Sequence, residues 1–219
     1  MNRLPGERLD RRRGPLPPVD PDAPPVGVLA LQGDVLEHVR ALAAVGLAPV
    51  PVRTPTELAG VHGIVLPGGE STAISRALDR AALAAPLTER IMDGMPVLGT
   101  CAGLILLSDE LTDGDDALPR PRGLAVRTRR NAYGPQTASF DVRFDVEGVE
   151  GGPMEASFIR APRIEEVLGG DVEVLARVDG SPVAVRQGPL IAMAFHPEVA
   201  GDLRLHALFA ASVRGEAGR

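Results

Sequence analysis

The sequence has 219 residues, one cysteine and a formal net charge of −6, and these figures exclude several kinds of protein. A single cysteine cannot form an internal disulfide or a multi-cysteine zinc site, which suits a reducing cytoplasm, and the negative charge argues against a nucleic-acid partner. Every positively charged residue is an arginine, so neither Schiff-base catalysis nor a P-loop lysine is available. No apolar stretch reaches the roughly 20 residues of a membrane helix, and we expect one cytoplasmic domain.

The first 25 residues differ in composition from the rest of the chain. They are rich in proline and contain the run Arg11-Arg12-Arg13, without the apolar residues that a folded core requires. We therefore expect an unstructured tail over residues 1–25 and a single domain over residues 26–215.

Strands and helices are expected to alternate through the next 85 or so residues. Apolar runs have the continuous pattern of strands covered on both faces, and helical spacing follows them. This alternation predicts an α/β fold with a mostly parallel central sheet flanked by helices. The expected strands are 26–31, 48–52, 63–66 and 96–98, with helices over 35–45, 74–81 and 86–93.

Two glycines, Gly68 and Gly69, follow the third expected strand. Their backbone N–H groups are accessible in such a strand-to-helix turn and form a cradle for an oxyanion or a carboxylate. The same stretch also suits a plain tight turn in which Ser71 or Thr72 caps the helix.

The only cysteine lies in the sequence Gly99-Thr100-Cys101-Ala102-Gly103, between an apolar run and a helix. This is the pattern of a nucleophile elbow, in which the central side chain is exposed at a sharp turn and the glycines let strand and helix approach closely. At a helix N-terminus, unpaired N–H groups favour the nucleophilic thiolate. A small buried side chain is the alternative interpretation of Cys101.

The second half of the chain is expected to be richer in strands, to add antiparallel strands to the parallel sheet and to contain a hairpin at Gly188. Arg130, in a polar loop, and Arg160, at a strand end, have side chains suited to a carboxylate, although isolated arginines are more often surface charges. The expected strands are 125–128, 139–144, 155–159, 172–178, 183–186 and 190–195.

The last expected strand leads into His196-Pro197-Glu198. In an extended segment, side chains two residues apart point the same way, so His196 and Glu198 are expected to be neighbours, with proline holding the chain extended. A carboxylate beside an imidazole fixes its tautomer and leaves the other nitrogen to take a thiol proton. A helix-initiating turn with a surface ion pair is the competing interpretation.

The remaining histidines are assigned no chemistry. His38 lies between Glu37 and Arg40 in sequence order, on the first expected helix, and we expect it to be solvated. His62 and His206 are interpreted as structural. By contrast, Cys101, His196 and Glu198 all follow expected strands, and ligands bind at the carboxyl ends of strands in open α/β sheets. A Cys101–His196–Glu198 triad is therefore our hypothesis.

These motifs resemble class I, triad-type glutamine amidotransferases, and more narrowly the glutaminase subunits of pyridoxal 5′-phosphate synthase. The elbow and the His-Pro-Glu sequence carry the broader resemblance. The narrower one rests on four stretches, namely Leu29-Ala30-Leu31-Gln32-Gly33, Leu66-Pro67-Gly68-Gly69-Glu70-Ser71-Thr72, Arg130-Asn131-Ala132-Tyr133-Gly134 and Phe158-Ile159-Arg160-Ala161-Pro162.

The resemblance implies a role for each matching residue. Cys101 is the nucleophile, His196 the general base and then acid, and Glu198 its orienting partner, in hydrolysis of L-glutamine through a γ-glutamyl thioester. Backbone N–H groups at Gly69 and Ala102 form the oxyanion hole. No cofactor or metal is implied. The implied glutamine-binding residues are Gly68, Gly69, Glu70, Arg130, Ile159 and Arg160.

The resemblance also implies a partner, the (β/α)₈-barrel subunit of the synthase, which receives the ammonia and activates the glutaminase on docking. One departure from the family pattern is Pro135, where the family usually has arginine, and this bears on coupling to the barrel. Two other functions stay open: an amidotransferase of another pathway, against which the Leu-Gln-Gly and Phe-Ile-Arg-Ala-Pro stretches argue, and a catalytically silent glutamine-binding module.

Overall fold

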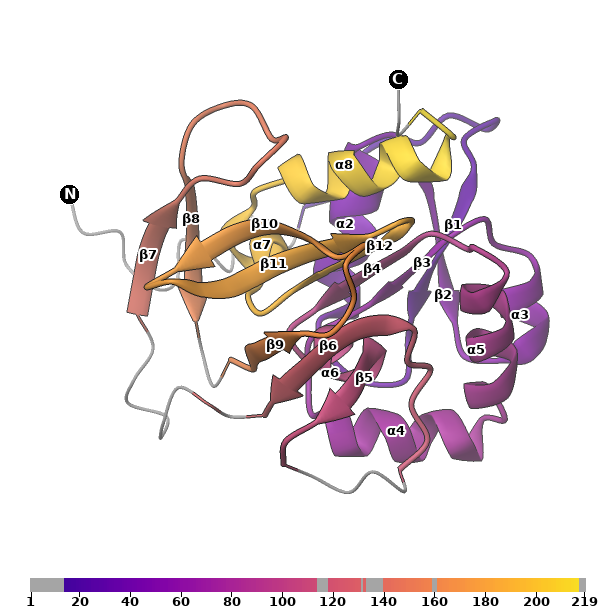
Figure 1. Ribbon diagram of the computed structural model, residues 1–219. Helices are drawn as coiled ribbons and strands as arrows, with labels where there is room; N and C mark the ends of the chain where they lie inside the picture. Colours follow the sequence, from indigo (N-terminus) through magenta and orange to yellow (C-terminus); the bar gives the residue numbers. More distant parts are fainter. Residues whose placement is uncertain (1–13, 114–117, 131, 133–139, 159–160, 217–219) are drawn as a thin grey trace.

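A central sheet of seven strands organises the molecule (Figure 1). The computed structural model describes residues 14–113, 118–130, 132, 140–158 and 161–216. The strands of the central sheet are β1 (Pro25–Leu29), β2 (Ala48–Val52), β3 (Ile64–Leu66), β4 (Val97–Thr100), β10 (Glu173–Val178), β11 (Ser181–Gln187) and β12 (Leu190–Met193).

The order of the strands across the sheet is β10-β11-β12-β4-β3-β1-β2. Strands β12, β4, β3, β1 and β2 run parallel to one another, whereas β10 and β11 are antiparallel additions, and β11 turns into β12 at Gly188 as expected. Every residue of β3, β4 and β12 is buried, which explains their continuous apolar sequences. The α/β fold with a mostly parallel sheet is confirmed.

Helices cover both faces of this sheet. In Figure 1, α2 and α8 lie together over one face, and α4, α5 and α6 lie on the other. None of the helices in the described ranges combines the length and the apolar character that a membrane span needs. The helices are α2 (Val35–Ala44), α3 (Pro55–Ala59), α4 (Ser71–Arg80), α5 (Ala84–Met92), α6 (Ala102–Leu107), α7 (Pro197–Ala200) and α8 (Arg204–Val213).

Two small sheets from the second half of the chain flank the central one. Strands β5 (Ser108–Leu111), β6 (Leu124–Arg129) and β9 (Arg163–Val167) form one, and β7 (Phe140–Phe144) pairs with β8 (Met154–Phe158) in the other. Phe144, Phe158 and Phe195 pack against one another with ring centroids 5.1–6.3 Å apart. This cluster anchors the chain at Phe195, immediately before His196.

Four short elements were not expected from the sequence: β5, β9, α3 and α7, the last of which replaces an expected extended segment. Strands β5 and β9 are polar and partly exposed, so they lack the apolar signal of a central strand. Helix α3 has only five residues, and it is stabilised by a capping box in which the Thr54 and Glu57 side chains bond to each other's backbone N–H groups. Elsewhere the expected elements are present, with ends that differ by a few residues.

The segment before the sheet differs slightly from the expected tail. Pro25 already belongs to β1, and the described residues 14–24 run to it as irregular chain. The Gly14 carbonyl accepts a hydrogen bond from Arg40, and the Pro24 carbonyl accepts one from the Ala48 N–H. Residues 1–13 of the expected tail lie outside the described residues.

Candidate active site

The nucleophile elbow predicted around Cys101 is present between β4 and α6. Cys101 has φ +48° and ψ −97°, a strained conformation for a residue with a Cβ, and it is the N-cap of α6. The residue is only 8% exposed, so it is buried, unlike the exposed apex of a typical elbow. The Cys101 N–H bonds to the Met193 carbonyl of β12, which holds the apex against the neighbouring strand.

The two glycines of the elbow make a close approach, as expected. A Cβ on Gly103 would lie 2.1 Å from the Leu66 carbonyl oxygen of β3, and one on Gly99 would lie 2.9 Å from the Gly103 carbonyl carbon. Both neighbours are backbone atoms that cannot swing away. Helix α6 therefore lies directly against β3 and β4, and this fixes the position of its N-terminus.

His196 and Glu198 are in contact, although not in the expected backbone conformation. His196 is the N-cap of the short helix α7, Pro197 is its first residue and Glu198 follows within its first turn. The segment is therefore a helix-initiating turn rather than an extended strand. His196 Nδ1 lies 2.8 Å from Glu198 Oε1, and the Glu198 side chain is buried rather than part of a surface ion pair.

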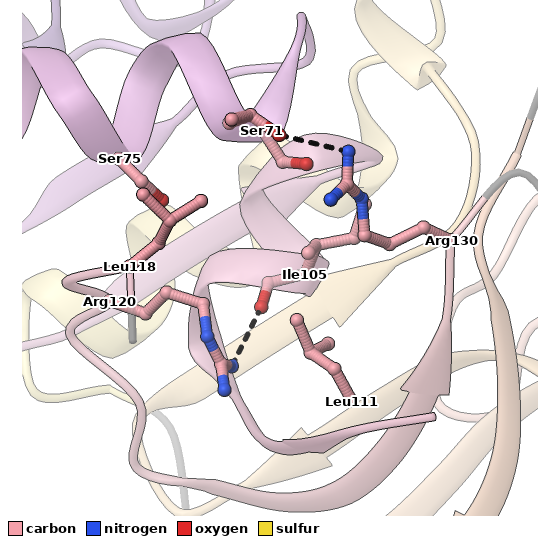
Figure 2. Close-up of a pocket in the computed structure, with 8 residues that line it drawn as sticks. Ser71, Ser75, Ile105, Leu111, Leu118, Arg120 and Arg130 are labelled. Atoms are coloured by element: carbon pink, nitrogen blue, oxygen red, sulfur yellow. Dashed lines mark hydrogen bonds between the residues drawn. The ribbon is translucent and has the colours of Figure 1, made fainter. Parts of the chain in front are cut away.

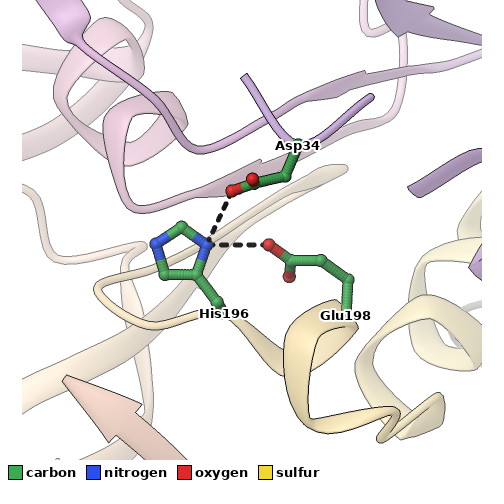
Figure 3. A group of neighbouring side chains, drawn as sticks. All are labelled: Asp34, His196 and Glu198. Carbon is green, nitrogen blue, oxygen red and sulfur yellow. Dashed lines mark hydrogen bonds and ion pairs between the residues drawn. The ribbon is translucent and has the colours of Figure 1, made fainter. Parts of the chain in front are cut away.

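Asp34 supplies a second carboxylate to the same histidine (Figure 3). Its Oδ2 lies 3.4 Å from His196 Nδ1, so the two carboxylates converge on one ring nitrogen. This leaves Nε2 as the ring nitrogen available to the Cys101 side chain, which contributes to raising the pKa of His196. Asp34 comes after β1, and it was not singled out from the sequence although it follows a strand as Cys101 and His196 do.

The charges around His196 favour its protonated form. Burial by itself lowers the pKa of His196, but hydrogen bonds to Asp34, Cys101 and Glu198 outweigh this effect and hold the pKa well above its usual range. Burial raises the pKa of Glu198, and the hydrogen bond and charge of His196 oppose that rise. An imidazolium beside Cys101 is thus stabilised by two carboxylates.

His38 is buried behind Glu198, which makes the expectation of a solvated side chain wrong. Its Nε2 lies 3.1 Å from Thr100 Oγ1 and 3.5 Å from Glu198 Oε1. Its Nδ1 lies 3.0 Å from Nε2 of the buried His206. The sequence did contain a signal, because His38 is three residues after Val35 and four before Leu42, on the apolar side of the helix.

The diglycine turn packs directly against His196. A Cβ on Gly68 would lie 2.1 Å from His196 Cε1, and the Gly68 carbonyl accepts a hydrogen bond from the Asp34 N–H. The Glu70 N–H that follows the turn donates to Gln32 Oε1. The turns after β1 and β3 are therefore joined to each other and to His196.

Glu70, rather than Ser71 or Thr72, caps helix α4. Its carboxylate accepts hydrogen bonds from the Thr72 and Ala73 N–H groups, and these, with Arg130, lower its pKa against the opposing effect of burial. Arg130 Nη2 donates to Thr72 Oγ1 at 3.0 Å and lies 3.4 Å from Glu70 Oε1. The structure thus brings together two of the residues expected to bind glutamine.

Arg130 also borders a hollow between α4 and α6 (Figure 2). Arg120 lies across the hollow from Arg130, and its guanidinium donates to the Ile105 and Ser108 carbonyls. Arg130 is therefore placed at the junction of this hollow and the N-terminus of α4. Ile159 and Arg160, also expected to bind glutamine, lie outside the described residues, as does Pro135. The hollow is lined by Ser71, Thr72, Ser75, Ile105, Leu111, Leu118, Arg120 and Arg130.

Sheet topology explains why these residues meet. Strands β12, β4, β3 and β1 are adjacent and parallel, and His196, Cys101, the Gly68-Gly69 turn and Asp34 follow their carboxyl ends in that order. This edge of an open α/β sheet is where ligands bind.

Comparison with known proteins identifies relatives along almost the whole folded part. The profile of the SNO glutamine amidotransferase family matches residues 28–214. Pyridoxal 5′-phosphate synthase subunit PdxT of Frankia alni is 55% identical over 191 residues, which is 87% of this chain and 96% of the relative. The subunit of the same name from Streptomyces coelicolor is 54% identical over 193 residues, 88% of this chain and 95% of the relative.

Solved structures agree with these sequence matches. A crystal structure described as a glutamine amidotransferase is 42% identical, with a TM-score of 0.80, and the match covers 86% of this chain and 98% of that one. A structure described as a putative GMP synthase subunit, at 20% identity and a TM-score of 0.60, shares the fold.

Proposed function

The chain belongs to the SNO glutamine amidotransferase family, and from this premise we infer that it is the glutaminase subunit of a pyridoxal 5′-phosphate synthase. It hydrolyses L-glutamine to L-glutamate and ammonia, and the ammonia serves cofactor synthesis on a second subunit. The observation that carries this function is the convergence at one sheet edge of a cysteine in a strained elbow and a histidine held by two carboxylates.

In this reaction the Cys101 sulfur attacks the side-chain amide carbon of glutamine. The protonated His196 then gives its Nε2 proton to the leaving nitrogen, so the C–N bond breaks, ammonia departs and a γ-glutamyl thioester remains. Neutral His196 next takes a proton from water, whose oxygen attacks the thioester and releases glutamate. The raised pKa of His196 suits the first proton transfer, because the ring is already protonated beside the sulfur.

Glu198 keeps the His196 ring in one orientation, with Nδ1–H on the carboxylate and Nε2 directed at the reacting atoms. The negative oxygen of each tetrahedral intermediate is stabilised by the Ala102 and Gly69 N–H groups, a contribution of roughly 3 kcal/mol per donor. Gly68 is required beside them, because a side chain there would displace the His196 ring.

Glutamine is recognised through the two charged groups on its α-carbon. Arg130 binds its carboxylate, and Glu70, beside Arg130 at the start of α4, binds its ammonium group. Gly68, Gly69, Ile159 and Arg160 complete the proposed glutamine site. The chain has no lysine, so the second subunit supplies any covalent lysine chemistry of the synthase.

The test is release of glutamate from glutamine by the purified chain, with and without the synthase barrel subunit of the same organism. We expect release that rises sharply with the barrel subunit and is lost in Cys101→Ala. Release that does not respond to the barrel would indicate an amidotransferase of another pathway. Absence of release in every condition, with normal binding of glutamine, would indicate a silent module.

A further inference from the structure

Two buried histidines lie behind the proposed catalytic residues and take no part in the reaction above. His38 in α2 and His206 in α8 are both fully buried, and their rings are joined by a 3.0 Å contact between His38 Nδ1 and His206 Nε2. Burial lowers the pKa of both, to about 4 for His206. Both rings are therefore neutral near pH 7, and each carries a single N–H.

The contacts decide which nitrogen carries each proton. Within the described part of the chain, His206 Nδ1 is buried and has no hydrogen-bond partner. A buried N–H without an acceptor is rarer and costlier than a buried lone pair, so the His206 proton belongs on Nε2. His206 then donates to His38 Nδ1, and the His38 proton must be on Nε2.

The His38 Nε2–H bonds to the end of β4 and lies close to Glu198. It lies 3.1 Å from Thr100 Oγ1, one residue before Cys101, and 3.5 Å from Glu198 Oε1. That carboxylate oxygen is the one that contacts His196 Nδ1 at 2.8 Å. The His206 N–H thus bonds to His38, and the His38 N–H bonds to Thr100 Oγ1 while the same nitrogen contacts Glu198 Oε1, so the pair holds one side of the buried carboxylate.

We propose that His38 and His206 are positioning residues, a relay of two N–H donors that holds the Glu198 carboxylate against His196. His206 sets the tautomer of His38, and His38 joins the strand end that carries Cys101 to the helix that carries Glu198. The proposal rests on the function inferred above, because it assigns the pair to the reaction performed by His196.

The charged and titratable groups that contact the relay and the catalytic residues determine how His196 titrates. His196 is faced by Asp34, Cys101, Glu198 and His38, and His206 is faced by Asp202. Glu198 is faced by His196, Asp34 and His38. Loss of His38 removes a contact that holds the Glu198 carboxylate in place, and a carboxylate that turns away from His196 no longer raises the pKa of His196, which therefore falls.

The chain has only four histidines, so an NMR titration of the chain labelled at its histidine ring nitrogens can follow His196 individually. In His38→Leu we expect the His196 midpoint to fall by about one pH unit, since weakening the hydrogen bond between His196 and the charged Glu198 has that effect. His38→Gln retains a hydrogen-bond donor, so its His196 midpoint should return most of the way to the wild-type value. His62→Gln, at an exposed position, is the control and leaves the midpoint unchanged.

The basic limb of the pH profile of kcat/KM, measured with the barrel subunit, should move by the same amount, because deprotonated His196 cannot protonate the leaving ammonia. A purely structural role would lower the thermal midpoint of unfolding without moving either titration. If His38→Leu does not fold, His206→Leu tests the same relay from its other end, and the His196 midpoint should again fall.

A folded His38→Leu or His206→Leu variant whose His196 midpoint stays within about 0.2 pH units of wild type overturns the proposal, since one hydrogen bond should exceed that shift. The NMR titration needs no turnover, so it stands apart from the proposed function. If wild type releases no glutamate with the barrel subunit, the proposed function fails whatever the titration shows.

Discussion

Replacing Glu198 with glutamine tests how His196 is held in the proposed reaction. The substitution keeps the size of the side chain and an acceptor oxygen but removes the charge that lies 2.8 Å from His196 Nδ1. A charge-assisted hydrogen bond exceeds a neutral one by about 1–1.5 kcal/mol, so the pKa of His196 should fall by about one unit. Burial already disfavours the charged form of Glu198, so the stability of the fold should not decrease.

The effect on rate is set by the second carboxylate. In serine proteases the loss of the triad carboxylate costs about 10⁴-fold because the histidine adopts the wrong tautomer. Here Asp34 Oδ2 lies 3.4 Å from the same nitrogen and still selects the Nδ1–H tautomer. We therefore expect Glu198→Gln to lower kcat by roughly 10²-fold, and Glu198→Gln combined with Asp34→Asn to approach the full ~10⁴-fold loss.

The assay is steady-state glutamate release at saturating glutamine with the barrel subunit present, and thermal unfolding of each variant confirms that it is folded. Asp34→Asn alone is the matched control. We expect it to lower kcat by no more than about tenfold, since the contact of Asp34 with His196 is longer than that of Glu198 and the Asp34 side chain is partly exposed. The reasoning is refuted if Glu198→Gln keeps kcat within about threefold of wild type, or if Asp34→Asn alone is the more damaging change.

Three further predictions concern the elbow, the glutamine site and acid stability. Gly103→Ala places a Cβ 2.1 Å from the Leu66 carbonyl, so it should destabilise the fold by more than about 2 kcal/mol in urea titrations; a smaller change would mean that α6 can move away from β3. Arg130→Ala should raise KM for glutamine roughly 10–100-fold with little change in kcat, and a change in kcat alone would argue against carboxylate binding. His206 has a folded-state pKa of about 4 against 6.5 when unfolded. Its contribution to the free energy of unfolding is therefore complete at neutral pH and is lost as the pH falls from 6.5 toward 4. The free energy of unfolding of wild type should therefore fall by about 3 kcal/mol between pH 7 and pH 4 because of this residue. In urea titrations of His206→Gln, the fall in unfolding free energy over the same pH range should be smaller by about that amount.

Much of the candidate site could be predicted because its residues follow strands directly in sequence. Cys101 is recognisable from the glycines two residues to either side, whose close packing against neighbouring backbone the structure confirms. His196 and Glu198 were expected to touch, and they do, although helix α7 rather than an extended strand brings them together. The contact was predictable because the two residues are close in sequence in either conformation.

Other contacts could not be predicted from local sequence patterns. Asp34 reaches His196 because β1, β3, β4 and β12 are adjacent in the sheet, and strand order is not encoded in the pattern of any single strand. Glu70 was expected to bind a ligand, but its capping of α4 and its contact with Arg130 depend on a loop 60 residues away.

The sequence by itself therefore determined the type of each long element, the α/β class and the residues placed at strand ends, because these follow from periodicity and turn chemistry within a few neighbouring residues. The tertiary structure alone decided which side chains meet behind those ends. His38 and His206 are 168 residues apart, and they pair because α2 and α8 pack on the same face of the sheet. Helical spacing can mark each as inward-facing, but only the packing of α2 against β1 and β2 and of α8 against β4 brings their ring nitrogens together beside Glu198.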